Sequence, residues 1–213
     1  MSRGLFISFE GGEASGKSLQ AKRLADALEH AGHDVVLTRE PGGTPLAERI
    51  RDIVLHAKEV PVGPEADVLL FSAARAQHVR DVIRPALAAG KVVISDRFFD
   101  STVAYQGAGR GADLAGVAAV TTFAVGDTRP HRTYVLDVPV DVALKRRAHE
   151  SARAWDRFEA DARSFHERLR EGYLRLAASE PRRVIVIDGD REPDEIAGEI
   201  RRDAEALVGA ARA

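Results

Sequence analysis

The 213-residue sequence contains no cysteine, and only five of its basic residues are lysines. The absence of cysteine excludes disulfide bonds, thiolate zinc sites and cysteine nucleophiles. The seven histidines show no HExxH-like spacing, so the sequence does not support a histidine metal site. Because lysine is rare in this chain, a lysine inside a glycine-rich motif, such as Lys17, stands out from the surface background.

The sequence also has little net charge and no long hydrophobic run. Its formal net charge is −2, so non-specific attraction to nucleic acid or to anionic membranes is not expected to dominate. The apolar run near the N-terminus is too short for a signal sequence or a membrane span. With 45% hydrophobic and 30% charged residues, the composition is typical of a soluble globular protein with one domain, residues 1–213. Because the N-terminal run is so short, a cytoplasmic location is expected. We therefore expect no nucleic-acid and no membrane partner.

Five short segments are rich in β-branched residues and almost fully apolar. They cover residues 5–9, 34–38, 91–95, 133–137 and 183–187. Strands that are apolar on both sides are covered on both faces, which is typical of parallel sheets. Helix-like segments separate these strands, so the pattern predicts an α/β fold with a five-stranded parallel sheet flanked by helices.

The segments between the strands repeat apolar residues at helical spacing. Helices are expected over 19–32, 64–90, 114–126, 141–150, 157–178 and 193–208. Gly32 and Gly90 end two of these helices as C-caps, and Pro85 is expected to kink or break the second. The segment 114–126 is apolar nearly all round, which predicts burial in the core or at an interface.

The stretch FEGGEASGKS (9–18) joins the first expected strand to the first expected helix. It matches the pattern G-x-x-x-x-G-K-[ST], in which backbone N–H groups and a helix N-terminus hold phosphate oxygens. Lys17 supplies a compact cation for the outer phosphates, and the Ser18 hydroxyl suits Mg²⁺. A glycine-rich turn with a surface lysine is the alternative, and the flanking strand and helix favour the phosphate loop (P-loop). The residues expected to bind the phosphates of a nucleoside triphosphate are Gly11, Gly12, Glu13, Ala14, Ser15, Gly16, Lys17 and Ser18.

Two further loops follow the second and third expected strands, at the carboxyl edge where open α/β sheets bind ligands. Asp96 is expected to reach the magnesium shell, partly through water, and the planar guanidinium of Arg97 suits a phosphate. Pro41 and the two glycines after it break helix and strand, which leaves Arg39 and Glu40 on a shaped loop. Seen alone, the Asp–Arg pair also fits a strand cap on the surface.

The next expected helix presents groups that suit a flat base. Phe71 and Arg75 lie four residues apart on one helical face, where the ring can stack on a base and the guanidinium can donate to a carbonyl oxygen. Ser101, Tyr105 and Gln106 lie near the end of the third strand and would close a polar pocket. On their own, these five residues fit a core phenylalanine, a solvated arginine, a helix cap and surface groups better.

Taken together, FEGGEASGKS, TREPGGT, LLFSAARAQHV, SDRFFDSTVAYQG and DRFEADARSFHERLREGY resemble the bacterial thymidylate kinase (dTMP kinase) family, over about residues 6–173. The resemblance implies a P-loop kinase of the nucleoside monophosphate kinase type that uses ATP and Mg²⁺ to convert dTMP into dTDP, and it implies a homodimer. It also implies that dTMP is bound by Glu10, Arg39, Glu40, Pro41, Phe71, Arg75, Arg97, Ser101, Tyr105 and Gln106.

Within that family, the implied contacts divide between base, sugar and phosphate. Phe71 stacks on thymine, Arg75 bonds its exocyclic oxygen, and Arg97 holds the dTMP phosphate. Tyr105 packs at the deoxyribose, where it disfavours a 2′-hydroxyl. Glu13 resembles the acidic residue of a bacterial subgroup in which the lid supplies the catalytic arginine.

The segment of about 145–161 carries several arginines around an alanine-rich centre, a composition that fits a lid insertion closing over ATP. Arg153 and Arg157 are expected to reach the phosphates, and Arg146 is expected to lie on adenine instead. For any single arginine, a solvated basic helix is at least as good an interpretation. The expected catalytic residues, which act by neutralising charge, are Lys17, Arg97, Arg153 and Arg157.

Other functions are compatible with parts of this pattern. Another nucleoside monophosphate kinase of the same fold would keep the P-loop but should lose the base pocket around Phe71 and Gln106. A nucleotide sensor without turnover should lack Lys17, Asp96 or Arg97, and all three are present. A P-loop GTPase is disfavoured because no NKxD-like segment occurs. A monomer with a thick core fits the sequence as well as a homodimer does.

Overall fold

Five parallel strands form one sheet in the order β2-β3-β1-β4-β5 in the computed structural model, which describes residues 4–56, 62–149 and 163–212. The strands are β1 (Leu5–Gly11), β2 (Val35–Arg39), β3 (Val92–Asp96), β4 (Arg132–Asp137) and β5 (Val184–Asp188). Each of the five segments expected from the sequence forms a strand, with ends that differ by one or two residues. The predicted α/β fold with a parallel sheet is therefore confirmed.

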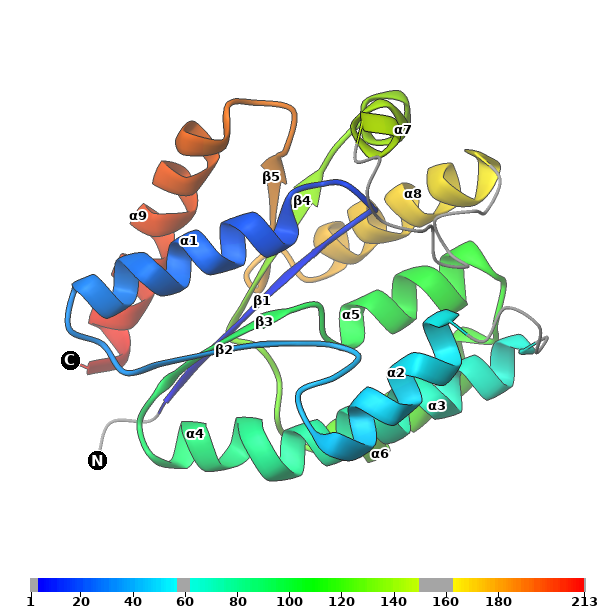
Figure 1. Cartoon of the computed structure of the whole chain (residues 1–213), viewed down its shortest axis with the longest axis horizontal. Coiled ribbons are helices and arrows are strands. Elements are labelled where there is room, and N and C mark those ends of the chain that lie inside the picture. The colour runs from blue at the N-terminus through cyan, green and yellow to red at the C-terminus, as the bar shows by residue number, and fades with distance from the viewer. Residues whose placement is uncertain (1–3, 57–61, 150–162, 213) are drawn as a thin grey trace.

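Helices cover both faces of this sheet (Figure 1). One layer contains α1 (Lys17–His30) and α9 (Pro193–Arg212), which also pack against each other. The other layer contains α2 (Pro45–His56), α3 (Pro64–His78), α4 (Arg84–Ala88), α5 (Phe99–Thr102), α6 (Leu114–Val125) and α8 (Arg163–Ser179). The helix α7 (Val140–His149) follows β4 and lies beyond its carboxyl end (Figure 1).

Side chains of β1 alternate between the two layers, as the pleat of a strand requires. Leu5, Ile7 and Phe9 belong to the core that α1 and α9 cover, whereas Phe6 packs with residues of α4 and α6 on the other face. Every residue of β1 is buried, which explains why the strand reads as a continuous apolar run. Glu10 shares the face of Phe6, and a carboxylate is therefore buried beneath the second layer.

The strand order creates a switch point between β1 and β3. The chain leaves β1 toward the β2 edge, whereas it leaves β3 across β1 toward β4. Crevices at such points lie outside the carboxyl ends of the two strands and are the usual ligand sites of open α/β sheets. The register pairs Phe9 with Asp96, so the loops that follow β1 and β3 begin side by side.

The long helix expected over 64–90 is continuous but not uniform. A π-helical segment, Val79–Ile83, lies between α3 and α4. Pro85 falls in the first turn of α4, where a missing N–H is tolerated, so the predicted kink or break becomes a local widening of the helix. Gly90 has a φ of 76° where the helix ends, as expected for a C-cap.

Two helices were missed by the sequence analysis. α2 follows the TREPGGT loop, and its first turn is capped by Thr44, whose hydroxyl accepts the Ala47 N–H at 3.2 Å. α5 continues into a second π-helical segment, Val103–Gly109. Both begin directly after loops that bear site residues, where turn signals dominate the local sequence. The helix expected over 157–178 is observed as α8 from Arg163, and residues 157–162 lie outside the described part of the chain.

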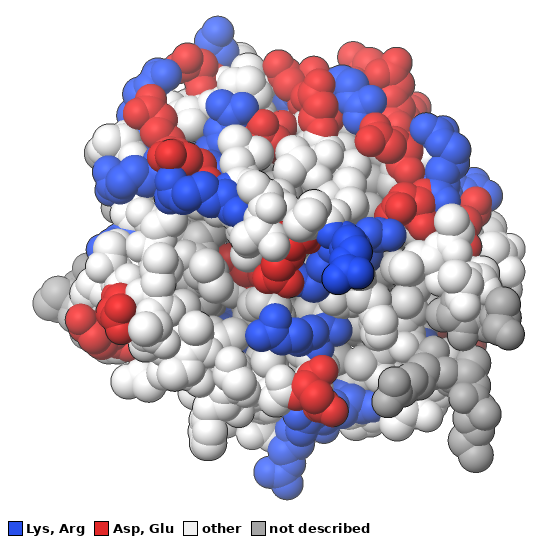
Figure 2. Space-filling model, turned by 180° about the vertical axis from the view of Figure 1, so that it is seen from behind, with Lys and Arg blue, Asp and Glu red and all other residues white. Residues whose placement is uncertain are grey.

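The outer side of α6 is exposed. Only Val117, Thr121 and Val125 of this helix are buried, whereas Phe123 is 92% exposed. The sequence predicted that this segment is buried in the core or at an interface. In the described structure only one side of α6 packs into the core, and its other side is exposed. The view from behind (Figure 2) shows acidic and basic side chains interspersed over one half of that face and a broad area with few charges over the side that bears α6. Among the described helices, none has the length and hydropathy needed to cross a bilayer.

The described core predicts the cost of removing a buried side chain. Leu28 of α1 is fully buried against the sheet, so Leu28→Ala should leave a cavity and lower the free energy of unfolding by about 2–5 kcal/mol. Urea denaturation measures this change. Leu46→Ala, on the 48% exposed position of α2, should cost about 0.5 kcal/mol or less, and equal losses for the two variants would contradict the described packing.

Candidate active site

The loop between β1 and α1 has the backbone of a phosphate cradle. Gly11 and Gly16 have φ values of 137° and 90°, which residues with a Cβ rarely adopt. α1 begins at Lys17, so the positive end of its dipole faces the loop. The Lys17 ammonium lies across the loop, with Nζ 2.5 Å from the carbonyl oxygen of Gly12 and 3.2 Å from Ser15 Oγ.

Lys17 is a cation in a position that disfavours its charge. The residue is only 6% exposed. Burial first, and the nearby charge of Arg97 second, lower the pKa of its amine to about 8. The carboxylates of Glu13 and Asp96 act in the opposite direction. Because few water contacts screen this ammonium, a phosphate oxygen beside it would be attracted strongly.

Ser18 and Asp96 bring two oxygen ligands together at the switch point. The Ser18 hydroxyl donates to Asp96 Oδ2 across the gap between α1 and the end of β3. Hydroxyl and carboxylate oxygens are the ligands that Mg²⁺ prefers. In the described residues no group of three or more His, Asp or Glu side chains could hold a metal. A hydroxyl and a carboxylate leave the rest of a coordination shell to waters and phosphate oxygens, so the pair fits Mg²⁺ bound in this way.

Arg97 projects into the same space from a left-handed backbone. Its φ is 69°, a conformation that costs a non-glycine residue about 1–3 kcal/mol. Its guanidinium donates to Glu13 Oε1 at 2.5 Å, to the Tyr105 hydroxyl at 2.9 Å and to Ser101 Oγ at 3.3 Å. It also lies 4.9 Å from the centre of the Tyr105 ring. Strain of this kind concentrates at functional sites.

These groups face one cleft of about 530 Å³. Most residues predicted from the sequence line it: Glu13, Ala14, Ser15, Gly16, Lys17, Ser18, Arg39, Glu40, Pro41, Phe71, Asp96, Arg97, Ser101, Tyr105 and Gln106. Leu19, Arg51 and Leu55 line it without having been predicted. Arg51 donates to the carbonyl oxygen of Pro41 at 2.8 Å and so ties α2 to the TREPGGT loop. Predicting α2 from its Thr44 cap would have drawn attention to this arginine.

Two residues predicted to contact a ligand lie beneath the cleft. Glu10 is fully buried, and Arg75 is 2% exposed. Arg75 donates to Glu40 Oε2 at 2.7 Å and to the Phe98 carbonyl oxygen at 3.3 Å, but its Nη1 has no hydrogen-bond partner among the described residues. The same is true of Nε2 of Gln106, a residue that contributes to the lining of the cleft although this atom is itself buried. Two unsatisfied donors near Phe71 are suited to the carbonyl oxygens of a base.

A buried ion network supports the TREPGGT loop. Glu40 Oε1 lies 2.9 Å from His78 Nδ1, while its other oxygen accepts the bond from Arg75. The second ring nitrogen of His78 lies 2.8 Å from Thr38 Oγ1. Glu40 therefore has partners on both oxygens and holds α3 against the loop, although part of its surface lines the cleft. Glycine is required at Gly43, because a Cβ there would meet the His78 ring at 2.7 Å.

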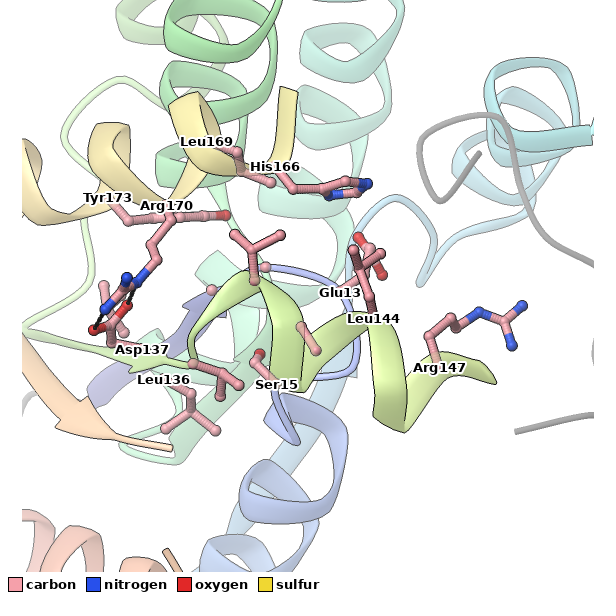
Figure 3. A pocket seen from close by; sticks show the side chains of 16 residues that line it. Glu13, Ser15, Leu136, Asp137, Leu144, Arg147, His166, Leu169, Arg170 and Tyr173 are labelled. Atoms are coloured by element: carbon pink, nitrogen blue, oxygen red, sulfur yellow. Dashed lines mark hydrogen bonds and ion pairs between the residues drawn. The ribbon is translucent and has the colours of Figure 1, made fainter. Parts of the chain in front are cut away.

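A second, smaller cavity of about 40 Å³ lies on the other side of the P-loop (Figure 3). α7 and α8 meet the loop around it, and Leu144 and Leu169 are among its apolar lining residues. Arg170 of α8 forms a paired contact with Asp137 at the end of β4, at 2.6 and 2.8 Å. The helices before and after the expected lid segment therefore line one cavity together with residues of the P-loop.

The predicted lid residues are described only in part. Arg153 and Arg157 lie outside the described residues. Arg146 donates to the Gly189 carbonyl oxygen at 3.0 Å and to Asp190 Oδ1 at 3.1 Å, so it joins α7 to the loop after β5. Arg147 is buried at the small cavity.

Comparison with known proteins agrees with this geometry. A family model described as thymidylate kinase matches residues 9–200. Relatives named thymidylate kinase include that of Syntrophotalea carbinolica, 50% identical over 90% of each chain, and that of Pseudomonas fluorescens (strain SBW25), 53% identical over 87% of each chain. The crystal structure of thymidylate kinase from Ehrlichia chaffeensis matches with a TM-score of 0.76 at 33% identity, covering 95% of this chain and 99% of that one.

Adjacent glycines of the loop provide a matched test of the cradle. A Cβ at Gly11 would lie 2.5 Å from the Leu136 carbonyl oxygen and would require a φ of 137°, whereas a Cβ at Gly12 would meet no atom within 4 Å. Gly11→Ala should therefore weaken binding of a non-hydrolysable ATP analogue by about tenfold or more, a loss of at least 1.4 kcal/mol, as measured by calorimetry. Gly12→Ala should change it less than about threefold. Equal effects would show that the loop backbone is not what holds the phosphates.

Proposed function

The chain belongs to the thymidylate kinase family, and from this premise we propose how its cleft carries out the reaction. It is a phosphotransferase that moves the γ-phosphoryl group of ATP to dTMP, giving ADP and dTDP. One observation supports the roles assigned below. The P-loop after β1 and the Arg97 turn after β3 open into the same cleft, at the switch point of the sheet.

On the donor side, the residues from Gly11 to Ser18 hold the phosphates of ATP. Backbone N–H groups and the N-terminus of α1 bind phosphate oxygens, and Lys17 neutralises the outer ones. Glu13 contributes to this cradle through its backbone, because its carboxylate is already paired with Arg97 and Tyr105. Its side chain instead connects the donor loop to the acceptor side.

Ser18 and Asp96 are the residues that would hold Mg²⁺. The hydrogen bond between them puts both oxygens at the mouth of the P-loop. Bound there with waters, Mg²⁺ supplies positive charge to the phosphate oxygens of ATP.

On the acceptor side, Arg97 holds the phosphate of dTMP, with Arg39 beside it. Arg39 now pairs with Glu48 at 3.0 Å on the exposed rim of the cleft, and such an exposed pair exchanges partners at little cost. The thymine ring lies against Phe71, and its carbonyl oxygens accept from the unsatisfied donors of Arg75 and Gln106. For this contact, a thymine carbonyl oxygen must reach the Arg75 guanidinium through the floor of the cleft.

Tyr105 stands where the deoxyribose must pass between base and phosphate. Its ring packs edge to face with Phe165 of α8 at 6.0 Å, and its hydroxyl accepts from Arg97. The ring is 6% exposed and held from two sides, so it cannot retreat to admit an extra hydroxyl group. This rigidity is the basis on which we expect discrimination against ribonucleotides.

In the reaction, a phosphate oxygen of dTMP attacks the γ-phosphorus of ATP while the bond to the β–γ bridging oxygen breaks. That oxygen leaves as part of ADP, and no side chain becomes covalently attached. The main obstacle is repulsion between two groups of negative charge, and positioning with charge neutralisation removes most of it. Lys17 acts from the donor loop and Arg97 from the acceptor turn. We assign Arg153 and Arg157, in the lid of about 145–161, the role of completing this neutralisation.

Replacing the acceptor arginine tests this assignment. Arg97→Ala should lower turnover with ATP and dTMP by about 10²–10³-fold, because the guanidinium stabilises charge in the transition state. A coupled assay of ADP release measures it, and Arg201→Ala, on the exposed side of α9, is the surface control. An effect below about threefold in a folded Arg97 variant would remove Arg97 from the mechanism.

The same assay separates this function from that of another nucleoside monophosphate kinase. With dTMP, dUMP, UMP and CMP as acceptors, the wild-type protein should prefer dTMP, and UMP should be disfavoured because Tyr105 blocks a 2′-hydroxyl. Equal rates with UMP and dTMP would contradict the proposed sugar contact.

We further propose that the exposed side of α6 joins two copies of this chain into a homodimer. It carries Phe123, at 92% exposure, together with the small exposed residues Ala115, Ala118 and Ala119. Small residues let helices approach closely, and a ring exposed to this degree gains most from burial. The neighbouring helix α3, which packs beside α6, adds Leu69 at 58% exposure.

A charge on this surface should separate the two copies. Phe123→Glu would bury a carboxylate at the interface, so we expect the variant to elute as a monomer where the wild type elutes as a dimer, with mass confirmed by light scattering. Ala210→Glu, at the exposed end of α9, is the control and should stay dimeric. A wild-type protein that is monomeric at micromolar concentration would overturn the proposal.

A further inference from the structure

The strained turn at Arg97 is held by hydrogen bonds on every side. The Arg97 N–H donates to the Phe9 carbonyl oxygen at 2.9 Å, and Ser95 Oγ donates to the Arg97 carbonyl oxygen at 2.7 Å. The next N–H, of Phe98, donates to Glu10 Oε1 at 2.7 Å. A left-handed conformation persists only where its surroundings determine it, and in this turn β1 supplies two of the three bonds.

Glu10 holds more than the backbone of this turn. Its Oε2 accepts from Ser101 Oγ at 2.6 Å and from the Tyr173 hydroxyl at 3.0 Å. Ser101 Oγ is in turn a partner of Arg97 Nη1 at 3.3 Å. The carboxylate therefore reaches the guanidinium by two routes: through the backbone at Phe98, and through the Ser101 side chain.

The position of this carboxylate is electrostatically unfavourable. Burial first, and the charge of Asp100 on α5 second, raise the pKa of Glu10 to about 7. Ser101, Arg97 and the Phe98 N–H act in the opposite direction, and the phenol of Tyr173 faces it from α8. A core position that serves packing alone is filled more stably by an apolar side chain, so the bonds made by Glu10 indicate a role at the turn.

We propose that Glu10 is a positioning residue for phosphoryl transfer. It fixes the turn after β3 and the Ser101 hydroxyl so that the Arg97 guanidinium faces the acceptor phosphate. The proposal rests on the proposed role of Arg97 and assigns Glu10 no contact with either nucleotide, because the residue is fully buried and does not line the cleft. It replaces the direct dTMP contact that the family resemblance implies for Glu10.

A double-mutant cycle tests whether Glu10 acts through Arg97. Glu10→Ala alone should lower kcat/KM for dTMP by about 100-fold, the loss expected when a charged group shifts by about 1 Å, while KM for ATP changes less than about threefold. In a protein that already carries Arg97→Ala, the same change should cost less than about threefold, because the group it positions is absent. Multiplicative losses in the double variant, or an equal effect on ATP, would overturn the proposal.

Ser8→Ala is the matched control. Ser8 lies on the same face of β1 and is fully buried, and its hydroxyl bonds Thr133 Oγ1 of β4 at 2.7 Å and not a group of the Arg97 turn. It should leave kcat/KM for dTMP within about threefold of the wild type; a loss as large as that of Glu10→Ala would mean that any buried polar group of β1 matters equally, which contradicts the proposal.

Glu10→Gln keeps the proposal testable if the alanine variant does not fold. Its amide oxygen can still accept from the Phe98 N–H, but its amide nitrogen cannot accept from Ser101 or Tyr173. The expected loss is therefore smaller, about tenfold, and it should again vanish in the Arg97→Ala background. If Arg97→Ala itself has no effect, the proposed function of that residue fails, whereas a large Arg97 effect with a multiplicative Glu10 effect sinks only the positioning role.

Discussion

Two anionic nucleotides must approach end to end for this reaction, and their mutual repulsion is the constraint around which the site is built. The molecule meets it with cations placed by two tight turns that follow adjacent parallel strands. Lys17 comes from the turn after β1 and Arg97 from the turn after β3, and the register of Phe9 with Asp96 brings those turns together. Because Lys17 is buried and the Arg97 side chain is only 17% exposed, water weakens their attraction for phosphate less than it would on an open surface.

Such turns are unfavourable in isolation, and the second layer of the fold stabilises them. Gly11 and Gly16 adopt the positive φ values of the P-loop easily because they have no Cβ. Arg97 has a Cβ, so its positive φ must be stabilised by hydrogen bonds. These bonds come from β1 and from Ser95 of β3. The Glu10 carboxylate, which makes one of them, also accepts from Ser101 of α5 and from Tyr173 of α8. The sheet therefore does more than carry the loops at its edge, because one buried side chain of β1 connects three elements to the acceptor arginine.

The sequence was sufficient for the fold class, the P-loop and the Asp96–Arg97 turn, because these features are local, whereas the base pocket around Phe71 and Gln106 followed only from the family resemblance. Each of these local features is a short contiguous stretch of sequence: the apolar strands, Gly16–Lys17–Ser18 and the Asp96–Arg97 pair. Arg51 was missed because its helix follows a glycine-rich loop that hides the helical pattern. The arrangement of Glu10 could not be predicted either, since its partners lie 88 to 163 residues away in the chain, and no spacing rule relates them.

A crystal structure of the protein with dTMP and ADP tests the central claim most directly. The account predicts a dTMP molecule whose phosphate is bonded to Arg97 and points toward the ADP held by the P-loop. Its base should lie against Phe71 and accept hydrogen bonds from Arg75 and Gln106. A dTMP molecule bound with its phosphate away from Arg97, or outside the cleft between the β1 and β3 turns, would contradict it.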